Sequence, residues 1–446
     1  MAQLTRTLRF SDLAFFFVGS VIGSGIFLTP GSVLLHVGGK IGPAMLVWLA
    51  GGVLSLLGAL TYAELAAMKP EHGGLYVFIR ECFGDFPAYM FGWTLFFVIA
   101  SGSVATLAVA FSKYLATLIP LSGSTEKIAS VGMVAVVGAL NVWGTRKSAG
   151  ATNWSTATKV GAILIMSAAL LYAGRGFAGS SGSIWPTEVT GGLASGFGVA
   201  MVAVLWAYEG WQYCTYAAGE VINPQRNLPI AFLLGSTALI GIYLLANFGY
   251  LAALGPGLAG HTESIAAVSV TNVIGPFYGK LVAVVILVSI FSAANTTLLG
   301  APRVFFAMAR DGLFFKQLAE VHPTFGTPAI SVVVCAIWSA VLALSGSFEQ
   351  LFTYVVFIGW IFYGLSAATI FVYRSRQPDL ERPYRVPGYP WTPILFVVAA
   401  AALVANTIVA EPIDSLKGLG VVFVGAPIYL ILRRRIKQTQ SAESGA

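Results

Sequence analysis

The chain has 446 residues and a formal net charge of +7, and 57% of its residues are hydrophobic while only 10% are charged. A typical soluble domain has about 25% charged residues. The composition therefore excludes an ordinary soluble protein and predicts an all-α protein that crosses a membrane many times.

Twelve apolar segments follow one another along the chain, and each is long enough to be a membrane-spanning helix. We expect them at residues 11–37, 43–68, 86–118, 127–145, 153–174, 192–222, 228–254, 276–306, 328–346, 349–373, 392–410 and 416–434. The N-terminal segment and the loops on its side hold most of the 25 Lys and Arg residues. The positive-inside rule then predicts a multi-pass protein of the cell (inner or plasma) membrane with both termini in the cytoplasm. This asymmetry accounts for the net charge, so no nucleic-acid partner is expected.

The first segment contains an unusual run of glycines. It reads "GSVIGSGIF" from residue 19 to 27, with Gly23 and Gly25 on either side of Ser24. Glycine costs about 1 kcal/mol relative to alanine inside a helix. The sixth segment has a similar weak point, because Glu209 is followed by Gly210 near its middle. Both segments are therefore predicted to be interrupted at bilayer depth.

The two interrupted segments are the first segments of the two halves of a ten-segment unit, about 11–174 and 192–373. Five segments per half give the halves opposite orientations, and paired interruptions in inverted halves indicate a transporter binding site. A helix that restarts near Ile26 would offer N–H groups to a carboxylate, and helices that end near Ile22 and Ala207 would offer carbonyls to an ammonium group. These ends suit an α-amino acid. The alternative is that the glycines only let helices pack closely.

Several motifs resemble those of the amino acid–polyamine–organocation (APC) superfamily, and most closely its L-type amino acid transporter branch. They are "GSVIGSGIFLTPG" (19–31), "ELAAMKPEHGGLYVFIRECFGDFPAYMFGW" (64–93), "WAYEGW" (206–211), "ANTTLLGAPRVFFAMARDG" (294–312), "VHPTFGTP" (321–328) and "PDLERPYRVPGYP" (378–390). The resemblance implies a LeuT-type fold, with five-plus-five inverted repeats, discontinuous helices 1 and 6 and two extra helices. Residues 1–373 would form the transport core, and residues 374–446 an inner loop, the last two helices and a cytoplasmic tail, with disorder expected from about Lys437.

The resemblance also implies a binding site. Backbone groups of Val21, Ser24 and Gly25 would hold the ammonium and carboxylate of the substrate, and the carbonyls of Trp206 and Glu209 would complete the ammonium site. The Trp206 ring would cover the pocket from outside. Further candidate pocket residues are Gly23, Ile26, Tyr208, Asn295 and Gly359. Asn295 has an alternative role, which is to bond a neighbouring helix.

Lys159 lies several residues inside the fifth segment and matches a lysine of the family. A lysine at this depth needs a partner, and the carbonyls freed by the break in segment one are suitable acceptors. A fixed ammonium there would replace the sodium ion of other LeuT-type transporters. The alternative is a lysine that extends to the membrane interface.

Glu209 stands where the L-type relatives commonly have glycine. It is either a protonatable coupling group, since removal from water disfavours a charged carboxyl, or a cap on a half-helix that begins near Trp211. Glu220 and Arg226 at the inner end would form an ion pair, acting either as a gate or as a loop anchor.

The sequence thus predicts a secondary transporter of small neutral L-amino acids such as Ala, Ser, Thr and Cys, because the large Trp206 side chain leaves little room. Sodium-independent exchange is the first expectation, and proton symport through Glu209 is the second. A membrane-embedded enzyme is disfavoured because the intramembrane ionisable residues are too sparse to form a catalytic cluster. We expect no catalytic residue, metal or cofactor. The animal L-type transporters that the chain resembles join a heavy subunit through a cysteine between helices three and four. Residues 119–130, at that place in this chain, contain no cysteine, so no disulfide-linked heavy subunit is expected.

Overall fold

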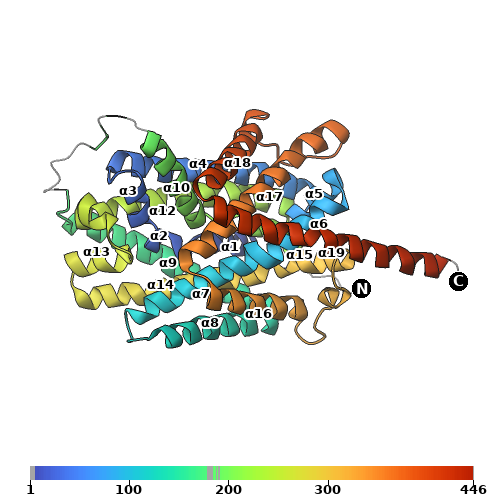
Figure 1. The fold of residues 1–446 in the computed structure, drawn as a ribbon, viewed down its shortest axis with the longest axis horizontal. Coiled ribbons are helices and arrows are strands. Elements are labelled where there is room, and N and C mark those ends of the chain that lie inside the picture. Colours follow the sequence, from blue (N-terminus) through green and yellow to red (C-terminus); the bar gives the residue numbers. More distant parts are fainter. Residues whose placement is uncertain (1–5, 178–183, 187, 189–190, 445–446) are drawn as a thin grey trace.

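The computed structural model describes residues 6–177, 184–186, 188 and 191–444, and most of this chain is helical (Figure 1). Ten helices in the described chain are long and apolar enough to cross a membrane. Two shorter apolar helices, Gly191–Ala207 and Ala329–Ser345, correspond to the sixth and ninth predicted segments. The expectation of an all-α, multi-pass membrane protein is confirmed.

The first half of the chain forms helices that end near residue 173. Their bounds are α1 Phe10–Val21, α2 Gly25–Leu28, α3 Pro30–His36, α4 Ile41–Met68, α5 Leu75–Phe83, α6 Asp85–Thr94, the π-helix η1 Leu95–Ala100, α7 Ser101–Ala116, α8 Gly123–Trp143 and α9 Thr145–Ala173. The predicted third span is therefore three consecutive pieces, and α5 is an additional short helix in the loop that precedes it.

The second half begins at α10, after a stretch that is only partly described. Its elements are α10 Gly191–Ala207, α11 Tyr213–Tyr216, the 3₁₀ turn η2 Ala218–Glu220, α12 Pro224–Gly260, α13 Ile265–Val273, α14 Pro276–Gly300, α15 Pro302–Arg310, the 3₁₀ turn η3 Lys316–Ala319, α16 Ala329–Ser345, α17 Phe348–Arg376, α18 Trp391–Ala410 and α19 Pro412–Ser444. The expectation of disorder after Lys437 is wrong, because the α19 backbone stays helical to Ser444.

The two interrupted spans lie inside the bundle. The α1 helix packs against α9, α12 and α14, while α10 packs against α3, α4, α17 and α18. The most exposed spans are α8, α9, α18 and the apolar part of α19. The chain therefore places its weakest helices where other helices, rather than lipid, meet their unpaired backbone groups.

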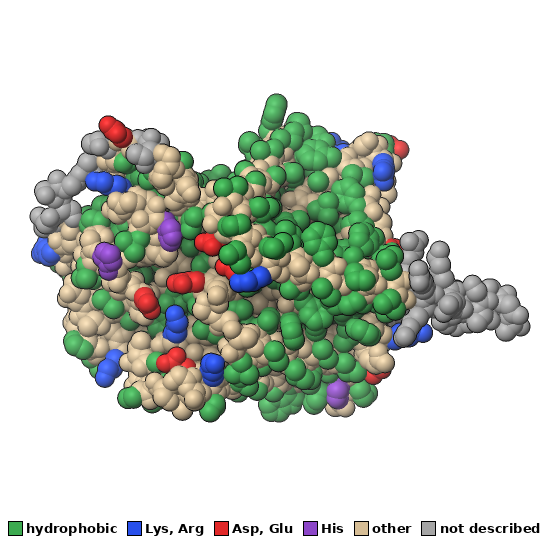
Figure 2. All heavy atoms as spheres, in the orientation of Figure 1, with side chains coloured by type: hydrophobic (Ala, Val, Ile, Leu, Met, Phe, Trp, Pro, Cys, Tyr) green, Lys and Arg blue, Asp and Glu red, His purple; other side chains and the backbone are tan. Residues whose placement is uncertain are grey.

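The surface shows which part of the molecule lipid would cover. Hydrophobic side chains gather over the right half of the face in Figure 2, while charged side chains lie mainly toward the left and at the right-hand edge. Both ends of the described chain lie on the right in Figure 1, as an even number of spans requires. We call this side the terminal face and the other side the opposite face.

Candidate functional site

The break in the first span occurs at the predicted position. The α1 helix ends at Val21, the backbone at Ile22 turns to an extended conformation, and α2 begins at Gly25. The α2 helix has only four residues before Thr29 joins it to α3. The first N–H groups of a helix have no intrahelical acceptor, so this end can donate hydrogen bonds, but its short length gives it little dipole.

The break in the sixth span is longer than expected. The α10 helix ends at Ala207, and α11 begins only at Tyr213, two residues beyond Trp211. Gly210 lies between them with φ of 121°, a conformation that favours glycine. A Cβ atom on Gly210 would lie 2.6 Å from the carbonyl oxygen of Ser20. Glycine at this position therefore lets the two breaks approach each other.

Lys159 contacts the break in the first span. Its side chain is fully buried, and Nζ donates to the carbonyl oxygens of Gly19 at 2.7 Å and Ile22 at 2.6 Å. The alternative in which this lysine extends to the interface is therefore wrong. The contact joins α9 to the end of α1, and what it contributes to transport stays a prediction.

Two further side chains, which the sequence pattern did not single out, bond the backbone at the breaks. The hydroxyl of Tyr243 donates to Val21 O and Ala207 O, at 3.2 and 2.9 Å, and so joins the ends of α1 and α10. Ser289 donates to the carbonyls of Ile22 and Gly23 at 3.2 and 3.3 Å. The available signal was their polarity in the middle of apolar segments, where a hydroxyl needs a partner.

Glu209 bonds side chains rather than the start of α11. Its Oε1 accepts from the Tyr363 hydroxyl and from Nε2 of Gln212, each at 2.5 Å. Gln212, the residue before α11, makes no side-chain capping bond, and within the described chain the Glu209 carboxylate bonds these two side chains and not the N–H groups of α11. The carboxyl therefore ties the unwound segment to α17.

The two breaks face one small cavity with a volume of about 20 Å³. Six predicted residues line it, namely Val21, Gly23, Ser24, Gly25, Trp206 and Glu209. Six that were not predicted complete its wall, namely Ser20, Ser103, Leu107, Tyr213, Ala293 and Thr297. This volume holds about one water molecule, so the walls must move apart to admit an amino acid.

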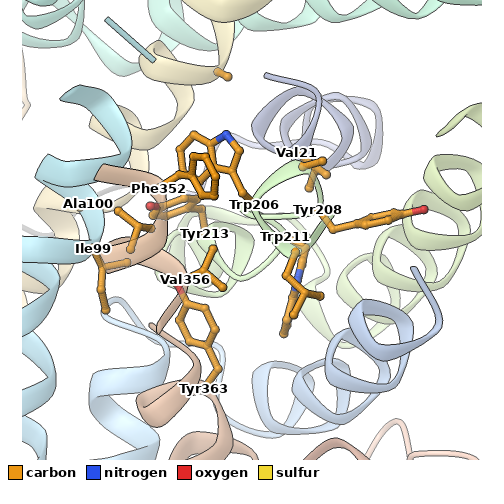
Figure 3. Packing of buried hydrophobic residues seen from close by; sticks show 14 of the residues in the cluster. Val21, Ile99, Ala100, Trp206, Tyr208, Trp211, Tyr213, Phe352, Val356 and Tyr363 are labelled. Carbon is orange, nitrogen blue, oxygen red and sulfur yellow. The ribbon is translucent and has the colours of Figure 1, made fainter. Parts of the chain in front are cut away.

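Four candidate pocket residues lie outside this lining, namely Ile26, Tyr208, Asn295 and Gly359. The Tyr208 ring packs at 4.9 Å from that of Tyr243, and Figure 3 shows it pointing away from Trp206. Asn295 accepts from Asn141 and donates to Thr152, so its side chain bonds neighbouring helices. Ile26 is fully buried in packing, and a Cβ on Gly359 would meet the Tyr363 ring.

Aromatic rings close the cavity toward the opposite face. The Trp206 indole stacks on Phe352 with ring centroids 6.0 Å apart and an interplanar angle of 24°, as Figure 3 shows. Phe348 packs edge-on against both rings. Beyond Phe352 lies a second cavity of about 270 Å³ that this residue also lines. Two stacked rings therefore separate the two cavities.

An ion pair closes the other route, toward the terminal face. The buried Glu220 carboxylate accepts hydrogen bonds from the buried Arg303 guanidinium, which also donates to the Leu299 carbonyl. The predicted pairing of Glu220 with Arg226 is therefore wrong, because helix packing brings Arg303 of α15 to Glu220, while Arg226 lies exposed in the first turn of α12. The backbone of Leu8 pairs with that of Val221 beside it.

A larger polar pocket of about 660 Å³ opens on the terminal face beside this ion pair. Its lining comes from the N-terminal segment, the loop after α4, helix α5, Gly219 and the end of α15, and it includes the charged residues Arg6, Glu71, Arg80, Glu81, Arg310 and Asp311. Burial lowers the pKa of His72 in this lining, although the nearby Glu220 carboxylate acts in the opposite direction. The small cavity thus lies between a closed aromatic side and a closed ionic side.

A family model described as "Amino acid permease" matches residues 8–431. The chain is 30% identical over 428 residues to the serine/threonine exchanger SteT of Bacillus subtilis, and the match covers 94% of each protein. It is 31% identical over 402 residues to b(0,+)-type amino acid transporter 1 of Mus musculus, covering 89% of this chain and 81% of the relative. It is 28% identical over 427 residues to Asc-type amino acid transporter 1 of Mus musculus, covering 93% and 78%.

Proposed function

Because the chain belongs to the amino acid permease family, in the L-type branch of the APC superfamily, we propose that it exchanges small neutral L-amino acids across the cell membrane without sodium. The substrates would be amino acids such as alanine, serine, threonine and cysteine. The terminal face would lie in the cytoplasm, and residues 1–373 would form the transport core. Relatives named as a serine/threonine exchanger and as amino acid transporters support this proposal.

The proposal rests on one observation, which is that two helix breaks face the same cavity. The carbonyl ends of α1 and α10 and the N–H end of α2 line the same space, through Val21, Trp206 and Gly25. Carbonyl oxygens accept hydrogen bonds from an ammonium, and free N–H groups donate to a carboxylate. An α-amino acid carries both groups on adjacent atoms. Transport by alternating access would then require the aromatic side and the ionic side to open in turn.

The wall around this space favours a small neutral side chain. Leu107 and Ala293 are apolar and would lie within 3.1 and 3.3 Å of a Cβ at Gly23, so the cavity is narrow there. The Glu209 carboxylate is engaged by Tyr363 and Gln212. A second charge on the substrate would therefore find no free partner of opposite sign among the described lining residues.

The buried lysine supports sodium independence. Lys159 Nζ donates to the carbonyls of Gly19 and Ile22, and carbonyl oxygens at a helix break are also suitable ligands for sodium. A fixed amine in this position would stabilise the break without an ion. Proton symport through Glu209 is the second candidate mechanism, because this carboxyl is buried in the unwound segment that lines the cavity.

Reconstitution in proteoliposomes tests the function. We expect labelled alanine to enter vesicles loaded with unlabelled alanine or serine much faster than empty vesicles, with the same rate in sodium and choline buffers. Strong inhibition by arginine alone in a panel of unlabelled amino acids would contradict the substrate class. Uphill uptake into empty vesicles that follows a proton gradient and disappears in Glu209→Gln would replace exchange by proton symport.

Replacing Trp206 with alanine tests the ring that closes the cavity. The indole stacks on Phe352 and lines the small cavity. We expect Trp206→Ala to raise the uptake of leucine and phenylalanine relative to alanine by about tenfold, since 1.4 kcal/mol of relative binding energy corresponds to that factor. Competition by unlabelled amino acids measures this ratio. An unchanged ratio in Trp206→Ala would show that this ring does not limit substrate size.

A further inference from the structure

One wall of the small cavity carries hydroxyl groups that the helix breaks do not explain. Ser103 comes from α7, Tyr213 from the start of α11 and Thr297 from α14, and all three line the cavity. None of them belongs to the backbone ends that would bind the ammonium and carboxylate of an amino acid. They are therefore available to contact the substrate side chain.

The Tyr213 hydroxyl is buried without a partner. The residue is 1% exposed, and its OH makes no hydrogen bond of normal geometry within the described chain, although the hydroxyls of Ser103 and Thr297 lie close to it. In Figure 3 the ring extends from the start of α11 toward the side of Ala100, the residue before α7. A buried hydroxyl that lacks a partner costs free energy, and its position on a cavity indicates that a ligand supplies the missing hydrogen bond.

Two neighbouring hydroxyls can share in this contact. Ser103 donates to Ile99 O at 2.7 Å and Thr297 donates to Ala293 O at 3.1 Å, both within their own helices. Each donor is thus used, and each oxygen keeps lone pairs that can accept a hydrogen bond. A ligand hydroxyl in this wall could donate to Ser103 or Thr297 and accept from Tyr213.

Resting on the proposed function, we propose that Ser103, Tyr213 and Thr297 form a side-chain subsite that selects small amino acids with a hydroxyl group. Serine and threonine would be preferred over amino acids of the same size that lack the hydroxyl. A site built to hydrogen-bond a substrate hydroxyl rejects the apolar analogue, because its own polar groups then stay unpaired. The narrow space beside Leu107 and Ala293 limits the same subsite to short side chains.

The test compares pairs of substrates of equal size in counterflow from alanine-loaded vesicles. The pairs are serine with 2-aminobutyrate and threonine with valine. In the unmodified protein we expect the hydroxylated member to compete about three- to tenfold better, the usual effect of one net hydrogen bond. In Tyr213→Phe and in Thr297→Val, both ratios should fall toward one, with each ratio taken relative to the alanine counterflow of the same variant.

Tyr216→Phe is the matched control. The Tyr216 hydroxyl is also buried without a partner in the described chain and its ring packs 5.4 Å from that of Tyr213, but it does not line the cavity. Its removal should leave both ratios unchanged. Ratios near one in the unmodified protein, or ratios that survive both Tyr213→Phe and Thr297→Val, would overturn the subsite and leave alanine exchange standing. Absence of alanine counterflow in the unmodified protein would instead overturn the proposed function, and the subsite with it.

Discussion

Lys159→Ala is expected to slow amino acid exchange by about tenfold or more, because leaving a buried carbonyl unpaired costs about 1–3 kcal/mol and 1.4 kcal/mol is a factor of ten. The alanine variant would remove both hydrogen bonds to Gly19 O and Ile22 O and with them the link between α9 and the end of α1. Ser289 would still reach Ile22 and Gly23, so the break would be weakened rather than lost. Counterflow of labelled alanine measures the effect.

Two control variants distinguish the loss of the buried amine from general effects of a substitution. Lys113→Ala removes a lysine that is exposed on α7 and should leave exchange unchanged. Lys159→Met keeps the length of the side chain without its donors and should be as slow as Lys159→Ala. Full activity in Lys159→Met would show that packing, and not hydrogen bonding, is what the lysine provides. Loss of uptake by the unmodified protein when sodium is omitted would refute the idea of a fixed amine in place of an ion.

Gly25→Leu is expected to weaken amino acid binding by about 100-fold, since forcing extra atoms into a packed site costs up to about 3 kcal/mol. A Cβ on Gly25 would collide with Cα of Ala207 and would lie 2.6 Å from its Cβ and 3.0 Å from its N atom. The new side chain would push the start of α2 away from the end of α10. Both ends line the cavity, so the ammonium and carboxylate positions would separate.

Two effects act at Gly25. Its backbone would hold the substrate carboxylate, so a side chain there would occupy the carboxylate position, and the structure shows that the same side chain would also collide with the backbone of the other broken helix. Gly241→Leu is the matched control, because a Cβ at this helical glycine would meet open space. The Gly25 variant should keep a single peak in size-exclusion chromatography. Unchanged affinity for alanine in that variant would remove the helix-end site.

Sequence alone was sufficient for the positions of the spans and of their interruptions. Hydrocarbon demands long apolar segments, so hydropathy shows each span directly. Glycine weakens a helix wherever it stands, and a polar break at bilayer depth is tolerable only inside the protein. Gly23, Gly25 and Gly210 therefore predicted the position of the site from sequence alone. Lys159 was visible for the same reason, because a lysine at that depth needs an acceptor.

Only the tertiary structure decided which side chains meet at that site. A hydroxyl in an apolar helix is equally visible in the sequence whether it bonds its own helix, a neighbour or a ligand, and helix rotation selects among these. Packing therefore directs Tyr243 to the two helix ends and Tyr213 to the cavity, and it turns Tyr208 away from the cavity. Packing also pairs Glu220 with Arg303, which is 83 residues away in the sequence, rather than with the nearby Arg226.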